Sequence, residues 1–194
     1  MRYLLAIAAA AVCVVIQSGS ASSQSARAKG DAALALLAQP RHHAIMRHAL
    51  APGIGDPSNF KIGDCQTQRN LSETGRIQAR RLGEVIKSSR IRVDHILSSQ
   101  WCRALETAKL LDLGPVKETE MLNSTFRQDQ SLGRERADAM VRYLDKLPDG
   151  ETAILVTHDV NIQALTRQSV GSGETLIVRI ANGRLEVVGE YPQP

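Results

Sequence analysis

The chain has 194 residues and a formal net charge of +4, and only 3% of its residues are aromatic. So few aromatic side chains exclude a stacking platform for nucleic acid. The basic residues are spread along the chain rather than run together, which suits a small anionic ligand better than a polyanion.

The first 21 residues have the layout of a secretory signal peptide. Met1-Arg2 gives a positive start, residues 3–16 are almost wholly apolar, and residues 17–21 are small and polar, which predicts cleavage after Ala21. An uncleaved membrane anchor is the alternative, but the apolar run is short of the roughly 20 residues that span a bilayer. We therefore expect a periplasmic or secreted mature protein without a membrane segment.

The rest of the chain is predicted to form a polar linker over 22–30 and a single domain over 31–194. Strands and helices alternate along this domain, and the run 152–156 is apolar throughout, as in strands buried on both faces. The helix that Ser72 begins carries its apolar side chains on one predicted inner face: Ile77, Leu82, Val85 and Ile86.

The predicted elements follow one another at α/β spacing. Strands are expected at 43–46, 95–98, 116–119, 152–156, 175–180 and 184–188, and helices at 31–37, 72–87, 102–111, 134–147 and 160–168. Asn182-Gly183 predicts a hairpin between the last two strands. The pattern predicts an α/β fold, a three-layer sandwich with a largely parallel central sheet, helices on both faces and a C-terminal β-hairpin.

Three of these strands end in polar side chains of one chemical character. The first ends in Arg47-His48, the second in Ser98-Ser99 with Arg103 soon after, and the fourth in Thr157-His158-Asp159. Parallel α/β sheets bind ligands at the carboxyl ends of their strands. Two histidines and two arginines in one pocket would repel one another unless a doubly charged oxyanion held them, and phosphate fits.

On these residues the sequence resembles the histidine phosphatase superfamily, which includes the phosphoglycerate mutases. The resemblance rests on an ordered set of segments that spans most of residues 42–168: Met46-Arg47-His48, Leu71 to Ala79, Ser98 to Ala108, and Thr157-His158. It implies that His48 is the nucleophile and forms a phosphohistidine that water hydrolyses. It also implies that Arg47, Arg103 and His158 bind the phosphoryl oxygens.

The sequence departs from the family pattern at Ala49, where the family has glycine after the Arg-His pair. We expect activity to survive with some change in pocket shape. The general acid is open between two positions. Asp159 matches the acid of the acid-phosphatase branch, and Glu118 or Glu120 would serve in the mutase-like branch; we favour Asp159, which could also cap the helix over 160–168.

The loop over 49–70 is predicted to form one wall of the pocket, and its Arg69 is a candidate for binding a second anionic group. Cys65 and Cys102 both flank the predicted site, and export favours oxidation, so we predict a disulfide between them. The chain has no Cys-x-x-Cys and no His, Asp or Glu cluster with metal spacing. A redox enzyme is therefore disfavoured, and we expect no metal or other cofactor.

These features together predict an exported phosphatase that hydrolyses phosphomonoesters through a phosphohistidine. Its expected substrate is a small phosphorylated molecule, a sugar phosphate or similar anion, and phosphorylated lipopolysaccharide sugars are one option. Two alternatives remain: a phosphohistidine-protein phosphatase, or a catalytically impaired phosphate- or phosphosugar-binding protein. The sequence predicts no oligomeric state.

Overall fold

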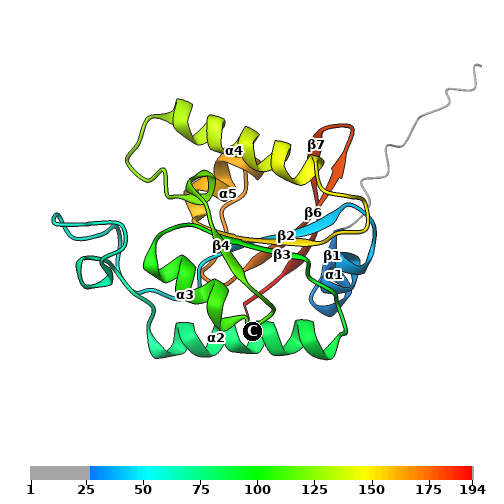
Figure 1. The fold of residues 1–194 in the computed structure, drawn as a ribbon, viewed down its shortest axis with the longest axis horizontal. Helices are drawn as coiled ribbons and strands as arrows, with labels where there is room; N and C mark the ends of the chain where they lie inside the picture. The colour runs from blue at the N-terminus through cyan, green and yellow to red at the C-terminus, as the bar shows by residue number, and fades with distance from the viewer. Residues whose placement is uncertain (1–26, 194) are drawn as a thin grey trace, which may run out of the picture.

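The computed structural model describes residues 27–193 of the chain. These residues form a seven-stranded sheet with helices packed against it (Figure 1). Its strand order is β1-β7-β6-β2-β5-β3-β4. The strands β2, β5, β3 and β4 are parallel neighbours, whereas β6 runs antiparallel to both β2 and β7. The predicted signal peptide over 1–21 lies outside the described residues.

Six of the seven strands lie where the apolar runs predicted them, and β1 was not expected. The strands are β1 (Ala28–Lys29), β2 (His42–Arg47), β3 (His95–Ser98), β4 (Val116–Glu118), β5 (Ala153–Thr157), β6 (Thr175–Ala181) and β7 (Arg184–Tyr191). β6 and β7 form the hairpin predicted around Asn182-Gly183, and both turn residues have positive φ. Every residue of β5 is buried, as its unbroken apolar sequence requires.

Helices cover both faces of the sheet (Figure 1). One face carries α1 (Asp31–Ala35), α2 (Glu73–Ser88) and α3 (Cys102–Leu110), and the other carries α4 (Gln130–Asp145) and α5 (Asp159–Thr166). Short 3-10 turns are η1 (Leu36–Ala38), η2 (Cys65–Thr67) and η3 (Glu120–Leu122). Met46 packs in the first core and its neighbour Ile45 in the second, because successive strand residues face opposite sides.

The structure corrects three local expectations. Residues 28–29, assigned to the linker, form the edge strand β1 beside β7. α4 begins four residues before the expected start, because the side chain of Asp129 accepts a hydrogen bond from the Ser131 N–H and caps the helix. Ile77 is 41% exposed and does not belong to the inner face of α2. The larger predictions of class, layers and hairpin are confirmed.

The first turn of helix α2 packs against the backbone that follows His48. Ser72 caps it by accepting the Gly75 N–H, as predicted. Gly75 permits a close approach, since a Cβ there would lie 2.2 Å from the carbonyl oxygen of Leu50. The backbone two residues beyond His48 is therefore packed against the first turn of α2.

No helix within residues 27–193 is both long and apolar enough to cross a membrane.

Candidate active site

The polar ends of three parallel strands meet at one edge of the sheet. Arg47 in β2 is level with Thr157 in β5, and Ser98 in β3 is level with Val156 in β5. The residues that follow, His48, His158 and Ser99, therefore emerge side by side. His48 and His158 line the floor of a pocket of about 480 Å³, whose walls are the loop over 49–70 and the segment before α4.

His48 is buried at the base of this pocket with its tautomer fixed. Its Nδ1 lies 2.8 Å from the carbonyl oxygen of Ala49, which can only accept, so Nδ1 carries the proton. Burial, joined by the charges of Arg103, Arg69 and Arg47, lowers the pKa of His48 to about 3, although the Ala49 hydrogen bond opposes the shift. The imidazole is neutral at physiological pH, and its Nε2 lone pair is available for attack.

Arg103 stands over that nitrogen and is itself held by an aspartate. Its Nε donates to Nε2 of His48 at 3.2 Å, and its Nη1 donates to Oδ1 of Asp56 at 2.7 Å. Asp56 also accepts the Trp101 indole N–H at 3.0 Å and the Arg69 backbone N–H at 3.0 Å. Burial alone would raise the pKa of Asp56, but these donors, Arg103 first among them, bring it below its usual value.

The two other predicted anion-binding arginines also line the pocket. Arg47 donates from Nη1 to the carbonyl oxygen of Val170 at 2.8 Å. Arg69 donates from Nε to the Gly55 carbonyl at 2.9 Å and from Nη1 to the Ala51 carbonyl. Arg69 thus stabilises the loop over 49–70, to which it belongs. Its role in binding a second anionic group stays a prediction.

His158 lies beside His48, with ring centroids 5.4 Å apart in an edge-to-face arrangement. The Ser99 hydroxyl lies 2.8 Å from Nε2 of His158 and ties the ends of β3 and β5 together. Burial, followed by the repulsion that a second proton would meet from a protonated His48 and from the nearby arginines, places the pKa of His158 well below its ordinary value. Together with Arg47 and Arg103, the two histidines form what we call the phosphoryl clamp. Both histidines are neutral, so the positive charge of the clamp lies on its arginines.

Of the three candidates for the general acid, only Asp159 lines the pocket. Glu118 and Glu120 are exposed and lie outside it. Asp159 is the first residue of α5, and its carboxylate accepts from the Ser169 hydroxyl at 2.9 and 3.0 Å and from the Val170 N–H at 2.8 Å. It therefore also fastens the loop on which Arg47 rests.

Ala49, which replaces the expected glycine, is fully buried and does not line the pocket. Its side chain packs in a small apolar cluster with Ala51, Leu71 and Ala79. Its N–H donates to the hydroxyl of Thr107 at 3.0 Å, which anchors the turn after His48 to α3. The substitution therefore affects the packing behind the pocket, and the expected change in pocket shape stays a prediction.

The structure joins the sulfurs of Cys65 and Cys102, as predicted, with their Cα atoms 5.7 Å apart. The bond links η2, in the loop over 49–70, to the first residue of α3. Arg103 is the next residue along that helix. The loop that carries Asp56 is thus covalently tied to the helix that carries the arginine bound to Asp56.

The charge of the pocket suits a dianion. Four arginines and two aspartates line it, an excess of two positive charges with both histidines neutral. Within residues 27–193, no three His, Cys, Asp or Glu side chains gather in a group that could hold a metal ion. The arrangement can bind a phosphoryl group and present a neutral imidazole nitrogen to its phosphorus.

Several residues of the pocket were not predicted from the sequence, among them four whose side chains matter to its shape. Asp56 and Phe60 stand in a loop without periodicity, Trp101 was quoted only as part of a motif, and Phe126 lies within the stretch 121–130, which was expected to be irregular. Trp101 stacks on Phe60 with ring centroids 4.9 Å apart. Half of the six aromatic residues in the sequence line the pocket: Phe60, Phe126 and Trp101. Their scarcity elsewhere was the one signal in the sequence that could have pointed to them.

Comparison with known proteins found one family model and several solved structures that match this chain. The family model described as histidine phosphatase superfamily (branch 1) matches residues 43–125. No curated protein matches the chain. Several solved structures share its fold.

The Rv3214 open reading frame of Mycobacterium tuberculosis aligns with a TM-score of 0.61 at 18% identity, over 77% of this chain and 97% of that one. A phosphoserine phosphatase of Entamoeba histolytica gives 0.59 at 15% identity, over 77% and 95%. A mycobacterial glucosyl-3-phosphoglycerate phosphatase, Rv2419c, gives 0.58 at 17% identity, over 76% and 96%.

Proposed function

We propose that this chain is a member of the histidine phosphatase superfamily, whose family model matches residues 43–125, and that it hydrolyses phosphomonoesters through a phosphohistidine on Nε2 of His48. One observation carries the proposal: the neutral His48 presents Nε2 beneath Arg103 in a pocket with two surplus positive charges. Phosphoryl transfer needs positioning and charge stabilisation more than covalent assistance, and forked guanidinium donors provide both.

The proposed reaction has two steps. Nε2 of His48 attacks phosphorus, the ester P–O bond breaks, and the leaving oxygen takes a proton from Asp159. Water then attacks the phosphohistidine, its proton passes to the Asp159 carboxylate, the P–N bond breaks, and inorganic phosphate leaves. Arg47 and Arg103 neutralise the phosphoryl oxygens throughout, and Arg103 exchanges its contact with His48 for one with the substrate.

Asp159 is proposed as the acid because it alone among the candidate carboxylates lines the pocket free of the arginine clamp. Asp56, the other lining carboxylate, is bound by Arg103, Trp101 and the Arg69 N–H. The ion pair with Arg103 favours the anionic form of Asp56, which has no proton to give, whereas the donors to Asp159 are uncharged. The reaction is proposed to need no metal ion.

Export is a further part of the proposal. The disulfide between Cys65 and Cys102 supports it, because such bonds persist in oxidising compartments. Expression of the full chain in a bacterial host, followed by fractionation and N-terminal sequencing, tests it. We expect a mature protein that begins after Ala21 outside the cytoplasm. An intact N-terminus in the cytoplasm would contradict this part and leave the chemistry untouched.

The test of the chemistry is hydrolysis of p-nitrophenyl phosphate by the wild type, His48→Ala and the matched control His95→Ala. His95 pairs with Glu151 away from the pocket. We expect turnover by the wild type and the control and none by His48→Ala. Rapid quenching with radiolabelled substrate should trap an acid-labile phosphoryl group on the wild type. Phosphate binding without turnover by the wild type would favour a binding protein.

A further inference from the structure

The phosphoryl clamp fills only the floor of the pocket. A phosphoryl group with four oxygens takes on the order of 100 Å³ if each oxygen needs about the 30 Å³ of a water molecule. The pocket measures about 480 Å³. Most of this volume lies above the clamp, where the leaving group of a bound phosphate ester must extend, since His48 attacks from the floor.

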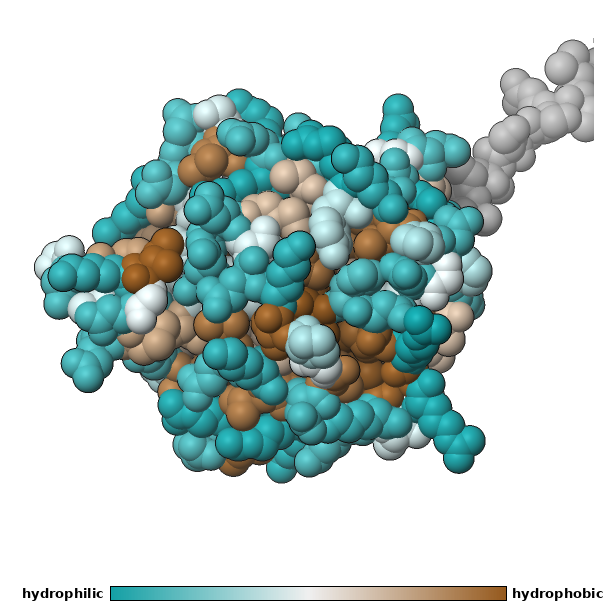
Figure 2. Space-filling model, viewed as in Figure 1, coloured by the Kyte–Doolittle hydropathy of each residue, from teal (hydrophilic) through white to brown (hydrophobic). Residues whose placement is uncertain are grey.

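The upper walls are strongly apolar for so polar a chain. The sequence has two phenylalanines and one tryptophan, and all three line this pocket: Phe60, Trp101 and Phe126. Ile54 joins them and is 87% exposed, and Phe126 is 40% exposed. Figure 2 shows brown surface at the left edge, where the loop over 49–70 approaches the segment before α4. Large apolar side chains left exposed together mark a binding surface.

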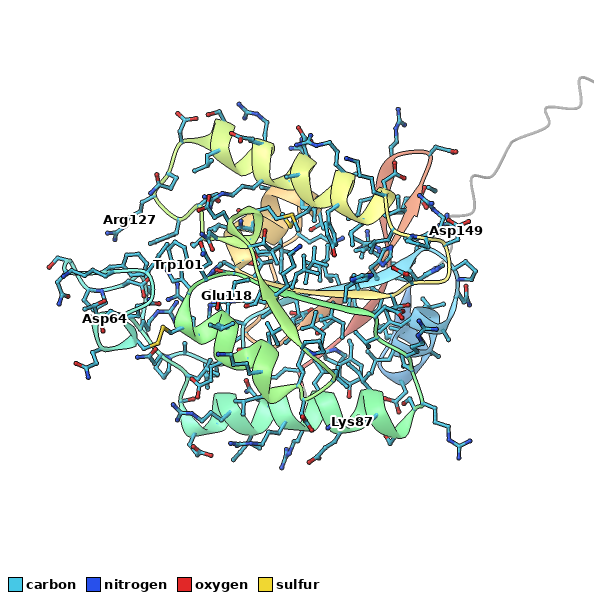
Figure 3. The ribbon with its side chains drawn as sticks, viewed as in Figure 1. Asp64, Lys87, Trp101, Glu118, Arg127 and Asp149 are labelled. Carbon is cyan, nitrogen blue, oxygen red and sulfur yellow. A yellow bond between two sulfur atoms is a disulfide. The ribbon has the colours of Figure 1, made fainter. Side chains whose placement is uncertain are left out.

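These side chains fall into two groups, one beside the clamp and one around Gly55 in the loop over 49–70. Trp101 stands edge-on to His158, with ring centroids 5.6 Å apart, and Phe60 stacks on Trp101. Phe126 faces Gly55, where an added Cβ would lie 3.7 Å from Cε1 of the ring. The guanidinium of Arg127 lies 5.2 Å from the centre of the Phe126 ring, and Figure 3 shows Arg127 and Trp101 on the same side of the molecule.

The polar groups of the upper walls are too few for a bare sugar. Arg69, Asp56 and Asp159 also line the pocket, but their polar atoms have partners within the protein. The remaining polar side chains outside the clamp that could bind hydroxyls are Ser124, Gln128 and Arg127. A polyol bound among Ile54, Phe60 and Phe126 would lose its hydrogen bonds to water without replacement, which is unfavourable. An aromatic or aliphatic leaving group would instead bury the exposed rings and gain ring–ring contacts.

We propose that the upper pocket is a leaving-group subsite for an aromatic or apolar group, so that the substrates are phosphomonoesters of such alcohols rather than of simple polyols. This proposal rests on the phosphatase function proposed above. It replaces the sugar phosphate expected from charge alone. Phe126 and Ile54 provide its outer wall, and Trp101 with Phe60 its inner wall.

The test compares benzyl phosphate with glycerol 3-phosphate. Both release an alkoxide of similar basicity, so the chemistry is matched and only the apolar bulk differs. We expect the wild type to prefer benzyl phosphate in kcat/KM by about tenfold or more, a factor that corresponds to 1.36 kcal/mol. Phe126→Ala should lower kcat/KM for benzyl phosphate by about tenfold and leave glycerol 3-phosphate within about threefold. Ile62→Ala, an exposed apolar residue outside the pocket, is the matched control and should change neither.

A binding measurement separates this proposal from the proposed function. Calorimetry on His48→Ala with benzylphosphonate and methylphosphonate needs no turnover, and benzylphosphonate should bind at least about tenfold more tightly. Equal binding of the two, or an equal loss for both substrates in Phe126→Ala, overturns the subsite. Tighter benzylphosphonate binding without hydrolysis of any ester by the wild type supports the subsite and overturns the phosphatase function instead.

Discussion

Nε of Arg103 donates a hydrogen bond to Nε2 of His48 across 3.2 Å, so the arginine covers the nitrogen that attacks in the proposed reaction. The same arginine is held from its other side by Asp56 at 2.7 Å. In the proposed reaction, the phosphoryl group of the substrate enters between Arg103 and His48 and replaces the hydrogen bond between them. The guanidinium then has a new partner for Nε and keeps Asp56 on Nη1.

Because Asp56 fixes Arg103, Asp56→Asn should lower kcat/KM for p-nitrophenyl phosphate by about 10- to 100-fold. The side chain touches no substrate atom in the proposed reaction, so it is a positioning residue. A hydrogen bond between charged groups contributes about 1.5–3 kcal/mol, which sets this range. The variant keeps an acceptor for the Trp101 indole, so the fold should survive.

Asp64→Asn is the matched control, since Asp64 is an exposed residue of the same loop whose side chain accepts the Gln66 N–H from η2 and has no contact with Arg103. It should retain wild-type kinetics. The loss in Asp56→Asn should fall mainly on kcat, because Arg103 remains in the pocket but loses its orientation. A variant with unchanged kcat and an intact melting curve would show that Arg103 needs no such brace.

The ionisation of His48 gives a second prediction. Its pKa in the fold is about 3, below the ordinary 6.5, because burial and the neighbouring arginines disfavour the charged form. A lowered pKa means that the neutral, nucleophilic form persists as pH falls from 7 to about 5. In an NMR titration of the free protein, the Cε1–H resonance of His48, assigned with His48→Ala, should therefore stay constant over that interval. A midpoint near 6.5 would contradict the burial argument.

Much of this site could be predicted because it is built from strand ends. The end of an apolar run predicts where a strand ends, and the carboxyl ends of the parallel strands β2, β3 and β5 lie at one edge of the sheet. The sequence therefore predicted that His48, Arg103 and His158 lie together. Asp56 could not be found this way. It lies in an aperiodic loop, 45 and 47 residues from the Trp101 and Arg103 side chains that it binds.

Helix faces were harder to predict than strand ends. Ile77 fits the apolar spacing of α2 yet is 41% exposed, while Gly75 and Gly83 come closest to the rest of the protein. A Cβ on Gly83 would lie 2.0 Å from the carbonyl oxygen of Leu111. The face of α2 that packs is thus set partly by where the helix lacks a side chain, which a hydrophobic pattern does not record.

Breaking the disulfide should lower both stability and activity. The bond closes a segment with a sequence separation of 37 residues, and closing a loop of that size stabilises the fold by about 3–4 kcal/mol. The variant carrying Cys65→Ser and Cys102→Ser should lose about that free energy of unfolding in denaturant. Its kcat/KM should also fall, because the loop bearing Asp56 is no longer tied to the helix bearing Arg103.

Dithiothreitol provides the control for this prediction. It should reproduce the loss of stability and activity in the wild type and have no effect on the double serine variant. If the reduced wild type kept its full activity while losing stability, the bond would brace the fold but not the clamp.

The last prediction concerns the proton that the leaving group needs. General acid catalysis contributes about 10²- to 10⁴-fold where the leaving group is basic. Asp159→Asn should therefore lower kcat for benzyl phosphate by about 100-fold or more. The loss for p-nitrophenyl phosphate, whose phenolate leaves without protonation, should stay below about tenfold.

Ser169→Ala is the matched variant for the structural share of Asp159, because it removes the hydroxyl that contacts both carboxylate oxygens. This variant should lower kcat for the two substrates by similar small factors, because it loosens the loop that holds Arg47 without removing the acid. An equal loss for both substrates in Asp159→Asn would identify Asp159 as a brace of that loop. In that case the proton would have to come from another group or from water.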